Sequence, residues 1–188
     1  MKLSKNLPLR VPYNIYIDPS NACNFKCTFC PTGNKELLKS VNRPLGIMKF
    51  NVFDKIVNDL TDMIKKYNQK PEFIALFKDG EPLLNKNLIP MISLLDKNQL
   101  SSRIHLTTNG SLINRDISEK LVGSGLKEIR FSIYHVNEKG YFGLTRKKIN
   151  FKNLVEKLKE FWEINKSFGS PINVRIHTID VNYTKSEK

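Results

Sequence analysis

Short runs of β-branched, aromatic and aliphatic residues alternate along this chain with longer segments of helical periodicity, and this alternation limits the possible folds most strongly. Five runs predict strands, at residues 13–18, 73–77, 103–108, 128–134 and 172–179. The segments between them predict helices that start at Asn51 as N-cap, at residue 87, near Ile117 and near Leu154. Strands separated regularly by helices imply right-handed crossovers and a parallel α/β sheet, either an open doubly wound sheet or a complete or partial barrel.

Length and composition fit one domain. The 188 residues, of which 40% are hydrophobic, can bury one sizeable core. We divide the chain into a basic lead (1–12), a core domain (13–182) and a polar tail (183–188). The first residues do not resemble a signal peptide, and no apolar run approaches the roughly 20 residues that cross a bilayer, so we expect a cytoplasmic protein that makes no use of a membrane.

The formal net charge of +13 is compatible with nucleic acid, an anionic membrane surface or an acidic substrate as a partner. The lysines are scattered along the whole chain and asparagine is frequent, which favours a bias in composition over a dedicated basic arm. Charge alone therefore does not choose a partner.

The three cysteines lie within eight positions, as Cys23, Cys27 and Cys30, with the spacing C-x3-C-x2-C. An odd and tight cluster does not form a disulfide framework, so a metal site is the better interpretation. A structural zinc site closes its tetrahedron with a fourth Cys or His, whereas an iron–sulfur cubane held by three thiolates leaves one iron open. A zinc knuckle would need one of the remote histidines, His105, His135 or His177.

Four unusual segments follow the predicted strands. The cysteine loop follows the first strand, Asp-Gly-Glu-Pro at 79–82 follows the second, Thr-Thr-Asn-Gly at 107–110 closes the third, and Ser132 lies near the end of the fourth. Ligands of parallel α/β folds gather at the carboxyl ends of strands. The sequence therefore predicts one site at this rim.

Taken together, these motifs resemble the radical S-adenosylmethionine superfamily over residues 13–182, with Phe29 at the aromatic position before the last cysteine. The resemblance implies a partial TIM-like (β/α)6 barrel with about five strand–helix units present. It implies a 4Fe-4S cluster on Cys23, Cys27 and Cys30, with S-adenosylmethionine chelated to the open iron. An external electron donor such as flavodoxin or ferredoxin would drive cleavage to a 5'-deoxyadenosyl radical, which abstracts a substrate hydrogen in oxidoreductase- or transferase-type chemistry.

The resemblance also assigns cofactor contacts residue by residue. Asp79-Gly80-Glu81-Pro82 is similar to the family's Gly-Gly-Glu-Pro segment, in which backbone and carboxylate receive the methionine ammonium, although Asp79 departs from the first glycine. The remaining implied contacts are Phe29 to the adenine, Asn109 beside the cofactor, Ser132 to the ribose and Arg146 to the methionine carboxylate. Lys147 and Lys148 follow Arg146, so a solvated basic face is an equal alternative for it.

The family core usually has six strand–helix units, and the chain ends just after the fifth predicted strand, so we expect a truncated barrel or one completed by a partner chain. The features are closest to the branch with a cysteine-rich SPASM or twitch domain, which acts on peptide, protein or sugar-related substrates. Two alternatives stay open: a basic, zinc-stabilised module that binds nucleic acid, and a fragment that binds the cluster without turnover.

Overall fold

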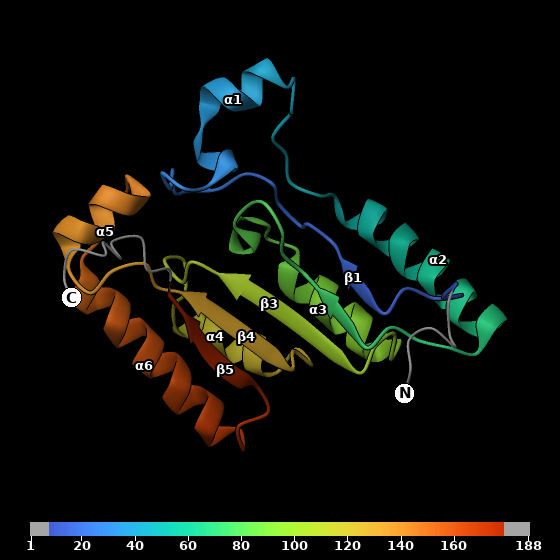
Figure 1. The fold of residues 1–188 in the computed structure, drawn as a ribbon. Coiled ribbons are helices and arrows are strands. Elements are labelled where there is room, and N and C mark those ends of the chain that lie inside the picture. Colours follow the sequence, from blue (N-terminus) through green and yellow to red (C-terminus); the bar gives the residue numbers. More distant parts are fainter. Residues whose placement is uncertain (1–7, 179–188) are drawn as a thin grey trace, which may run out of the picture.

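The computed structural model describes residues 8–178 and shows one parallel sheet with helices packed on one face (Figure 1). The strands are β1 (Asn14–Tyr16), β2 (Phe73–Ala75), β3 (Arg103–Thr108), β4 (Glu128–Ser132) and β5 (Asn173–His177). All five strands that the sequence predicts are present, most of them shorter than expected. Residue 179 of the fifth, residues 179–182 of the expected core domain, the tail 183–188 and the first seven residues of the lead lie outside the described residues.

The strand order decides between the two architectures that the sequence left open. The strands pair in the order β1-β2-β3-β4-β5, and every pair is parallel. A doubly wound sheet reverses its strand order at a switch point, whereas a sequential order with helices on one side curves into a barrel. Within residues 8–178, β1 and β5 each pair with one neighbour, so the sheet is the partial barrel that we expected.

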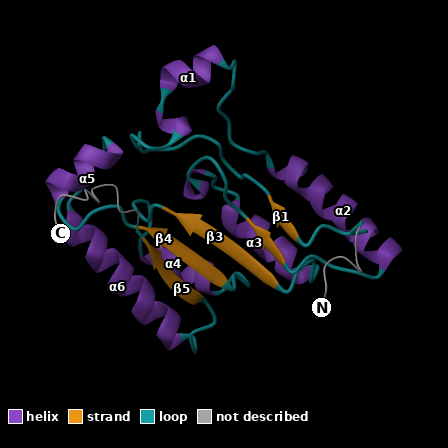
Figure 2. Ribbon diagram, in the orientation of Figure 1, coloured by secondary structure: helices purple, strands orange, loops and turns teal. Residues whose placement is uncertain are grey.

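Four helices correspond to the four segments of helical periodicity, namely α2 (Phe50–Tyr67), α3 (Leu88–Lys97), α4 (Arg115–Val122) and α6 (Phe151–Ser167). Sequence patterns missed α1 (Lys35–Ser40) and α5 (Glu138–Thr145): α1 has only 6 residues, and α5 carries two glycines among its 8, so neither sustains a helical periodicity. Figures 1 and 2 place α1 and α5 beyond the carboxyl ends of the strands. No helix among the described residues combines the length and apolarity needed to cross a membrane.

The helix ends show one wrong prediction and one that is confirmed. Asn51 is not an N-cap, because α2 starts one residue earlier and its capping position is Lys49, whose side chain makes no capping hydrogen bond. The apolar stripe of α2, with Phe53 and Val57 buried, positions this helix without a polar cap. Gly169 follows α6 with φ of +79°, the left-handed conformation in which glycine ends helices.

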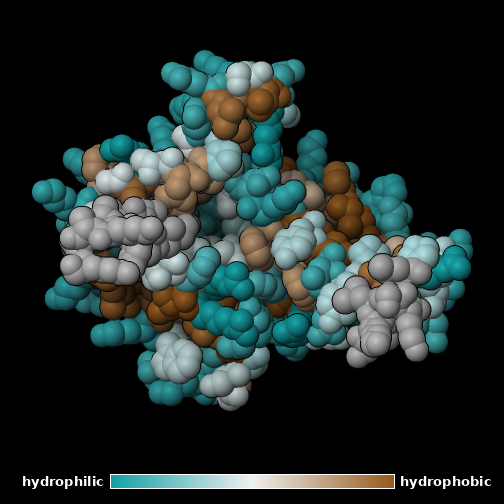
Figure 3. Space-filling model, viewed as in Figure 1, coloured by the Kyte–Doolittle hydropathy of each residue, from teal (hydrophilic) through white to brown (hydrophobic). Residues whose placement is uncertain are grey.

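The two faces of the sheet differ in chemistry. Alternate residues such as Ile74, Ile104 and Ile129 point toward the helices and are fully buried or nearly so. Phe131 on β4 meets Phe161 on α6 edge to face, with ring centroids 5.3 Å apart, which joins sheet and helix layer. The other face carries no helix and is turned toward the viewer in Figure 3, where hydrophilic side chains gather over the middle strands.

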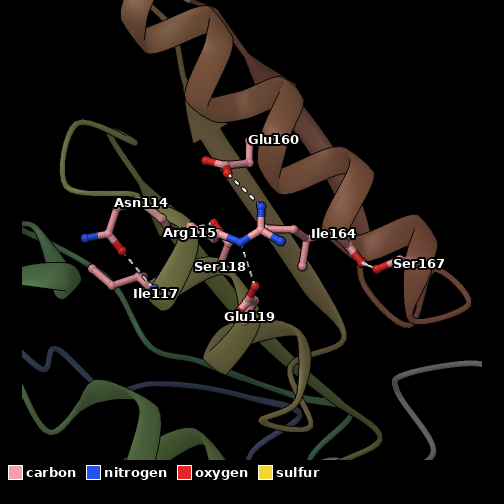
Figure 4. A network of polar contacts seen from close by, with 8 residues as sticks. All are labelled: Asn114, Arg115, Ile117, Ser118, Glu119, Glu160, Ile164 and Ser167. Atoms are coloured by element: carbon pink, nitrogen blue, oxygen red, sulfur yellow. Dashed lines mark hydrogen bonds and ion pairs between the residues drawn. The ribbon is translucent and has the colours of Figure 1, made fainter.

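Polar contacts on the outside of the helix layer connect α4 to α6 (Figure 4). Arg115 lies 3.0 Å from Glu119 on its own helix and 3.4 Å from Glu160 on α6. Asn114 caps α4 by accepting a hydrogen bond from the backbone amide of Ile117. The Arg115 side chain is 70% exposed, so these ion pairs orient the helices and add little stability.

Candidate functional site

The cysteine loop lies at the carboxyl end of β1 and is held from two sides. Internally, the amide of Cys30 donates to the carbonyl of Cys27 at 3.1 Å. From outside, the carbonyls at the end of α5 accept hydrogen bonds from the loop, Thr145 from Lys26 at 2.9 Å and Leu144 from Thr28 at 2.8 Å. α5, which sequence patterns missed, thus supports the cysteine loop through these hydrogen bonds.

The Asp-Gly-Glu-Pro segment presses directly against the approach to Cys23. A Cβ at Gly80 would lie 2.0 Å from the carbonyl oxygen of Ser20 and 2.5 Å from that of Ala22, so only glycine fits. The amide of Glu81 donates to the Ala22 carbonyl at 2.9 Å. The loops after β1 and β2 therefore form one packed unit, with Pro82 buried at the start of the short 3₁₀ helix η3 (Pro82–Leu84).

The three thiols are free, and burial opposes the ionisation of two of them, Cys23 and Cys27. Burial, followed by the charges of Cys23 and Cys30, raises the pKa of Cys27 to about 12. Burial also raises the pKa of Cys23, although the amide of Phe25 donates to its sulfur at 3.4 Å. Three neighbouring thiols, of which Cys27 is buried and Cys23 and Cys30 are half-buried, fit a metal group that would displace their protons as it binds.

Within residues 8–178, no group of three or more His, Cys, Asp or Glu side chains converges on a point that one metal ion could occupy. The three histidines are dispersed: His105 lies on β3, His135 follows β4 and His177 ends β5. A cubane cluster requires no such point of convergence, because each of its protein ligands binds a different iron.

Glu81 is buried, and its carboxylate joins the loop after β2 to the end of β3. One oxygen accepts hydrogen bonds from the Thr108 hydroxyl at 2.6 Å and the Leu83 amide at 3.1 Å, and the other accepts from the Asn109 amide at 2.8 Å. Burial raises the pKa of Glu81, and these hydrogen bonds oppose that rise. The carboxylate thus holds the loop after β2 and the end of β3 in a fixed relative position.

Asn109 connects the same rim to the cysteine loop. Its amide nitrogen donates to Asn24 at 2.9 Å, and its amide oxygen accepts from the Ser111 hydroxyl at 2.7 Å. Asn24 in turn donates to Ser111 at 2.9 Å, which closes a triangle of side chains. Sequence reasoning did not single out Asn24 or Ser111; the available signal was their position directly beside Cys23 and the Asn109-Gly110 turn.

Asp79, where the family has a glycine, pairs with a residue far along the chain. Its carboxylate forms an ion pair with Arg43, in the segment between α1 and α2, and its amide donates to Asp18 at 3.3 Å. Asp79 does not have positive φ, so the segment keeps its path without the glycine. Burial raises the pKa of Asp18, and Oδ1 of Asp18 has no hydrogen-bond partner among the described residues.

Aromatic rings surround the cysteine loop, and sequence reasoning identified only Phe29 among them. Phe29 contacts Tyr134, which follows β4, with ring centroids 5.1 Å apart, and Phe25 contacts Tyr141 of α5 at 6.2 Å. Burial raises the pKa of Tyr134 to about 12, and the nearby thiols act in the same direction. The signal for Tyr134 was its place at the end of the fourth predicted strand.

The two remaining predicted contacts differ in exposure. Ser132 is buried at the end of β4, and its carbonyl accepts a hydrogen bond from Tyr141 at 3.5 Å. Arg146 is exposed and ends α5 with φ of +54°, directly after Thr145, the residue that binds the cysteine loop. All the predicted residues therefore come from loops and strand ends at one rim of the sheet.

The chain is similar in sequence to one protein family and to several characterised proteins. The family model of the radical SAM superfamily matches residues 17–185. GTP 3',8-cyclase of Desulforamulus reducens is 25% identical over 88% of this chain and 44% of its own length. The dTDP-4-amino-4,6-dideoxy-D-glucose ammonia-lyase of Streptomyces venezuelae is 25% identical over 87% of this chain and 32% of its own length.

Solved structures share the fold. SuiB of Streptococcus suis bound to the precursor peptide SuiA superimposes with a TM-score of 0.69, at 21% identity, over 97% of this chain and 36% of SuiB. anSMEcpe with bound AdoMet gives a TM-score of 0.59 at 22% identity, over 87% of this chain and 44% of that protein. The chain thus spans less than half the length of these relatives. By the match of the family model over most of its length, the chain belongs to the radical SAM superfamily.

Proposed function

We propose that this chain is a catalytic core that holds a 4Fe-4S cluster on Cys23, Cys27 and Cys30 and binds S-adenosylmethionine at the adjoining rim. Members of the superfamily bind these two groups. When bound, they supply one-electron cleavage of S-adenosylmethionine to a 5'-deoxyadenosyl radical that removes a hydrogen atom from a substrate. The observation that carries the proposal is the braced loop of three thiols at the carboxyl ends of the parallel strands.

The protein's own residues supply the ligands and keep them in place. The thiols would release their protons on metal binding, because the charge of the iron would offset the raised pKa values of Cys23 and Cys27. The amide that donates to the sulfur of Cys23 stabilises this thiolate. Gly80 packs against the backbone just before Cys23, and the carbonyl of Thr145 accepts a hydrogen bond from Lys26 within the loop. These two contacts limit the positions that the three sulfurs can occupy.

S-Adenosylmethionine would be received by the predicted residues around this loop. The backbone at Gly80 and Glu81 would face the methionine ammonium, and exposed Arg146 would supply the positive charge for the carboxylate. The Phe29 ring, supported by Tyr134, would pack against the adenine. Buried Ser132 would contact the ribose, and Asn109 would hold the rim through Asn24.

The substrate and the electron donor belong to the same proposal. Superfamily enzymes generally need an external reductant, and we propose a flavodoxin or ferredoxin for this chain. The similarity to an ammonia-lyase of a dTDP-sugar and to a peptide-bound structure supports a substrate of the peptide, protein or sugar-related class.

Anaerobic reconstitution tests the proposal. The chain is supplied with ferrous iron and sulfide, iron and sulfide are counted, electron paramagnetic resonance is recorded with and without S-adenosylmethionine, and 5'-deoxyadenosine is assayed under dithionite. We expect four irons per chain, a spectral change on cofactor addition, and product. The variant with all three cysteines replaced by alanine is the control and should show none of these.

Two results would contradict the proposal. Uptake of one zinc ion in place of the cluster, together with binding of nucleic acid, would support the basic binding module. A full cluster without 5'-deoxyadenosine would show that the chain binds metal but does not turn over.

A further inference from the structure

The uncovered face of the sheet carries a layer of aromatic and charged side chains below the rim. The strand register aligns Tyr16 with Ala75, His105 and Glu128 in one row across β1 to β4, and Arg130 with Arg175 across β4 and β5. Neighbouring residues of parallel strands point to the same face. All of these side chains except Ala75, together with Phe73, Phe77 and Arg103, line a cleft of about 180 Å³.

One side of this cleft is aromatic. Tyr16 meets Phe73 and Phe77 edge to face, with ring centroids 5.7 and 5.9 Å apart. Phe77 also meets the His105 ring at 5.0 Å. Tyr16 is 54% exposed, so an aromatic surface on this side remains open to a ligand. Such rings stack on planar groups with a favourable, geometry-dependent energy.

The other side of the cleft is formed by guanidinium groups with spare hydrogen-bond donors. Arg175 and Arg130 approach the buried carboxylate of Glu128 at 3.5 and 3.7 Å, which is longer than a hydrogen bond. Neither side chain donates a hydrogen bond within residues 8–178. Each guanidinium carries five N–H donors in a planar fork that matches a carboxylate or phosphate.

The charge balance of the cleft favours an anion. Arg103, Arg130 and Arg175 contribute three positive charges, and the acids that pair with them in the described part of the chain are Glu128 and Glu72, the latter 3.2 Å from Arg103. His105 adds no charge near neutrality, because burial lowers its pKa to about 4. One positive charge therefore remains, next to an aromatic surface.

We propose that this cleft binds a small aromatic anion, with the ring against Tyr16 and Phe77 and the carboxylate or phosphate on Arg130 and Arg175. The identification of this ligand with the substrate, or with a part of it, rests on the proposed function. His105 and Asn109 lie on the same face of β3 and its extension, about 13 Å apart along the strand. The cleft would thus anchor a remote part of the ligand while its reacting part extends to the rim.

Calorimetric titration of the 188-residue chain tests the proposal with simple probes and without a cluster or S-adenosylmethionine. Phenyl phosphate and phenylacetate carry both features and distinguish a phosphate from a carboxylate, whereas inorganic phosphate and phenol carry one feature each. We expect one of the two aromatic anions to bind measurably more tightly than inorganic phosphate and phenol. Arg130→Gln with Arg175→Gln should weaken this binding by about tenfold, as for loss of hydrogen bonds to a charged group.

Tyr16→Leu and Arg115→Gln complete the design. Tyr16→Leu should weaken the binding of the aromatic anion and leave the binding of inorganic phosphate unchanged. This variant keeps the assay informative if the double arginine variant does not fold. Arg115→Gln, on the outside of α4, should bind like the unmodified chain. The proposal would be overturned if all four probes bound equally well, or if Arg115→Gln weakened the binding of the aromatic anion as much as the double arginine variant does. A chain that binds the aromatic anion but makes no 5'-deoxyadenosine would keep this inference and lose the proposed function.

Discussion

The buried carboxylate of Glu81 accepts a hydrogen bond of 2.8 Å from the backbone amide of Asn109, so the loop after β2 is bonded to the end of β3. Because Thr108 and Leu83 donate to the same side chain, the residue expected to receive a cofactor ammonium is also a structural centre of the rim. This relationship changes what a substitution at Glu81 should do.

Glu81→Ala should lower the free energy of unfolding by about 3 kcal/mol, because it leaves the buried donors of Thr108 and Asn109 and the half-buried amide of Leu83 without an acceptor. Urea unfolding of the metal-free chain measures the effect, with the half-exposed Glu119→Ala as the control. The sequence-based prediction that Glu81→Ala also weakens S-adenosylmethionine binding is tested on reconstituted protein. Unchanged stability together with lost cofactor affinity would show that the carboxylate serves the cofactor alone.

Gly80→Ala should displace the cysteine loop, because its Cβ would lie 2.0 Å from the backbone oxygen of Ser20. We expect a lower melting temperature and substoichiometric iron after reconstitution. Gly143→Ala is the matched control, since a Cβ there meets no atom within 4 Å and alanine favours the interior of α5. Normal iron content in the Gly80 variant would contradict the close packing described here.

The pH dependence of stability should report on His105. Its pKa is lowered from 6.5 to about 4 in the folded chain, so the folded state resists protonation and the unfolded state does not. The stability present above pH 6.5 should therefore be lost as the pH falls toward 4. Chemical unfolding at several pH values measures how steeply the free energy of unfolding changes with pH. His105→Gln should reduce this dependence, whereas the same substitution at exposed His177 should leave it unchanged.

Asp79 and Arg43 should behave as one unit in a double-mutant cycle. Asp79→Asn and Arg43→Gln each break the ion pair that connects the segment between α1 and α2 to the loop after β2. We expect each single variant to speed proteolysis of that segment, and the double variant to add little to either one. Fully additive effects would show that the two side chains act independently.

Several features of this protein were predictable from the sequence because they depend on neighbours along the chain. The strands and long helices follow from local periodicity, as with the stripe of Phe53 and Val57 on α2. The spacing of Cys23, Cys27 and Cys30 is likewise a local property, and the open-cornered metal group that it indicates stays a prediction. α1 and α5 escaped prediction because α1 is only 6 residues long and α5 carries two glycines among its 8 residues.

Contacts across the fold were decided by the tertiary structure alone. Periodicity does not encode strand order, so the sequential sheet that distinguishes a barrel from a doubly wound fold appeared only when the crossovers were in place. The bonds of Glu81 and Asn24 to Asn109, and the approach of Tyr16 and Arg175 to one cleft, join residues that are distant in sequence. The sequence pattern predicts which side chains are buried. Only the folded chain determines which of them contact one another, because these contacts depend on the register between strands and on the helices that connect them.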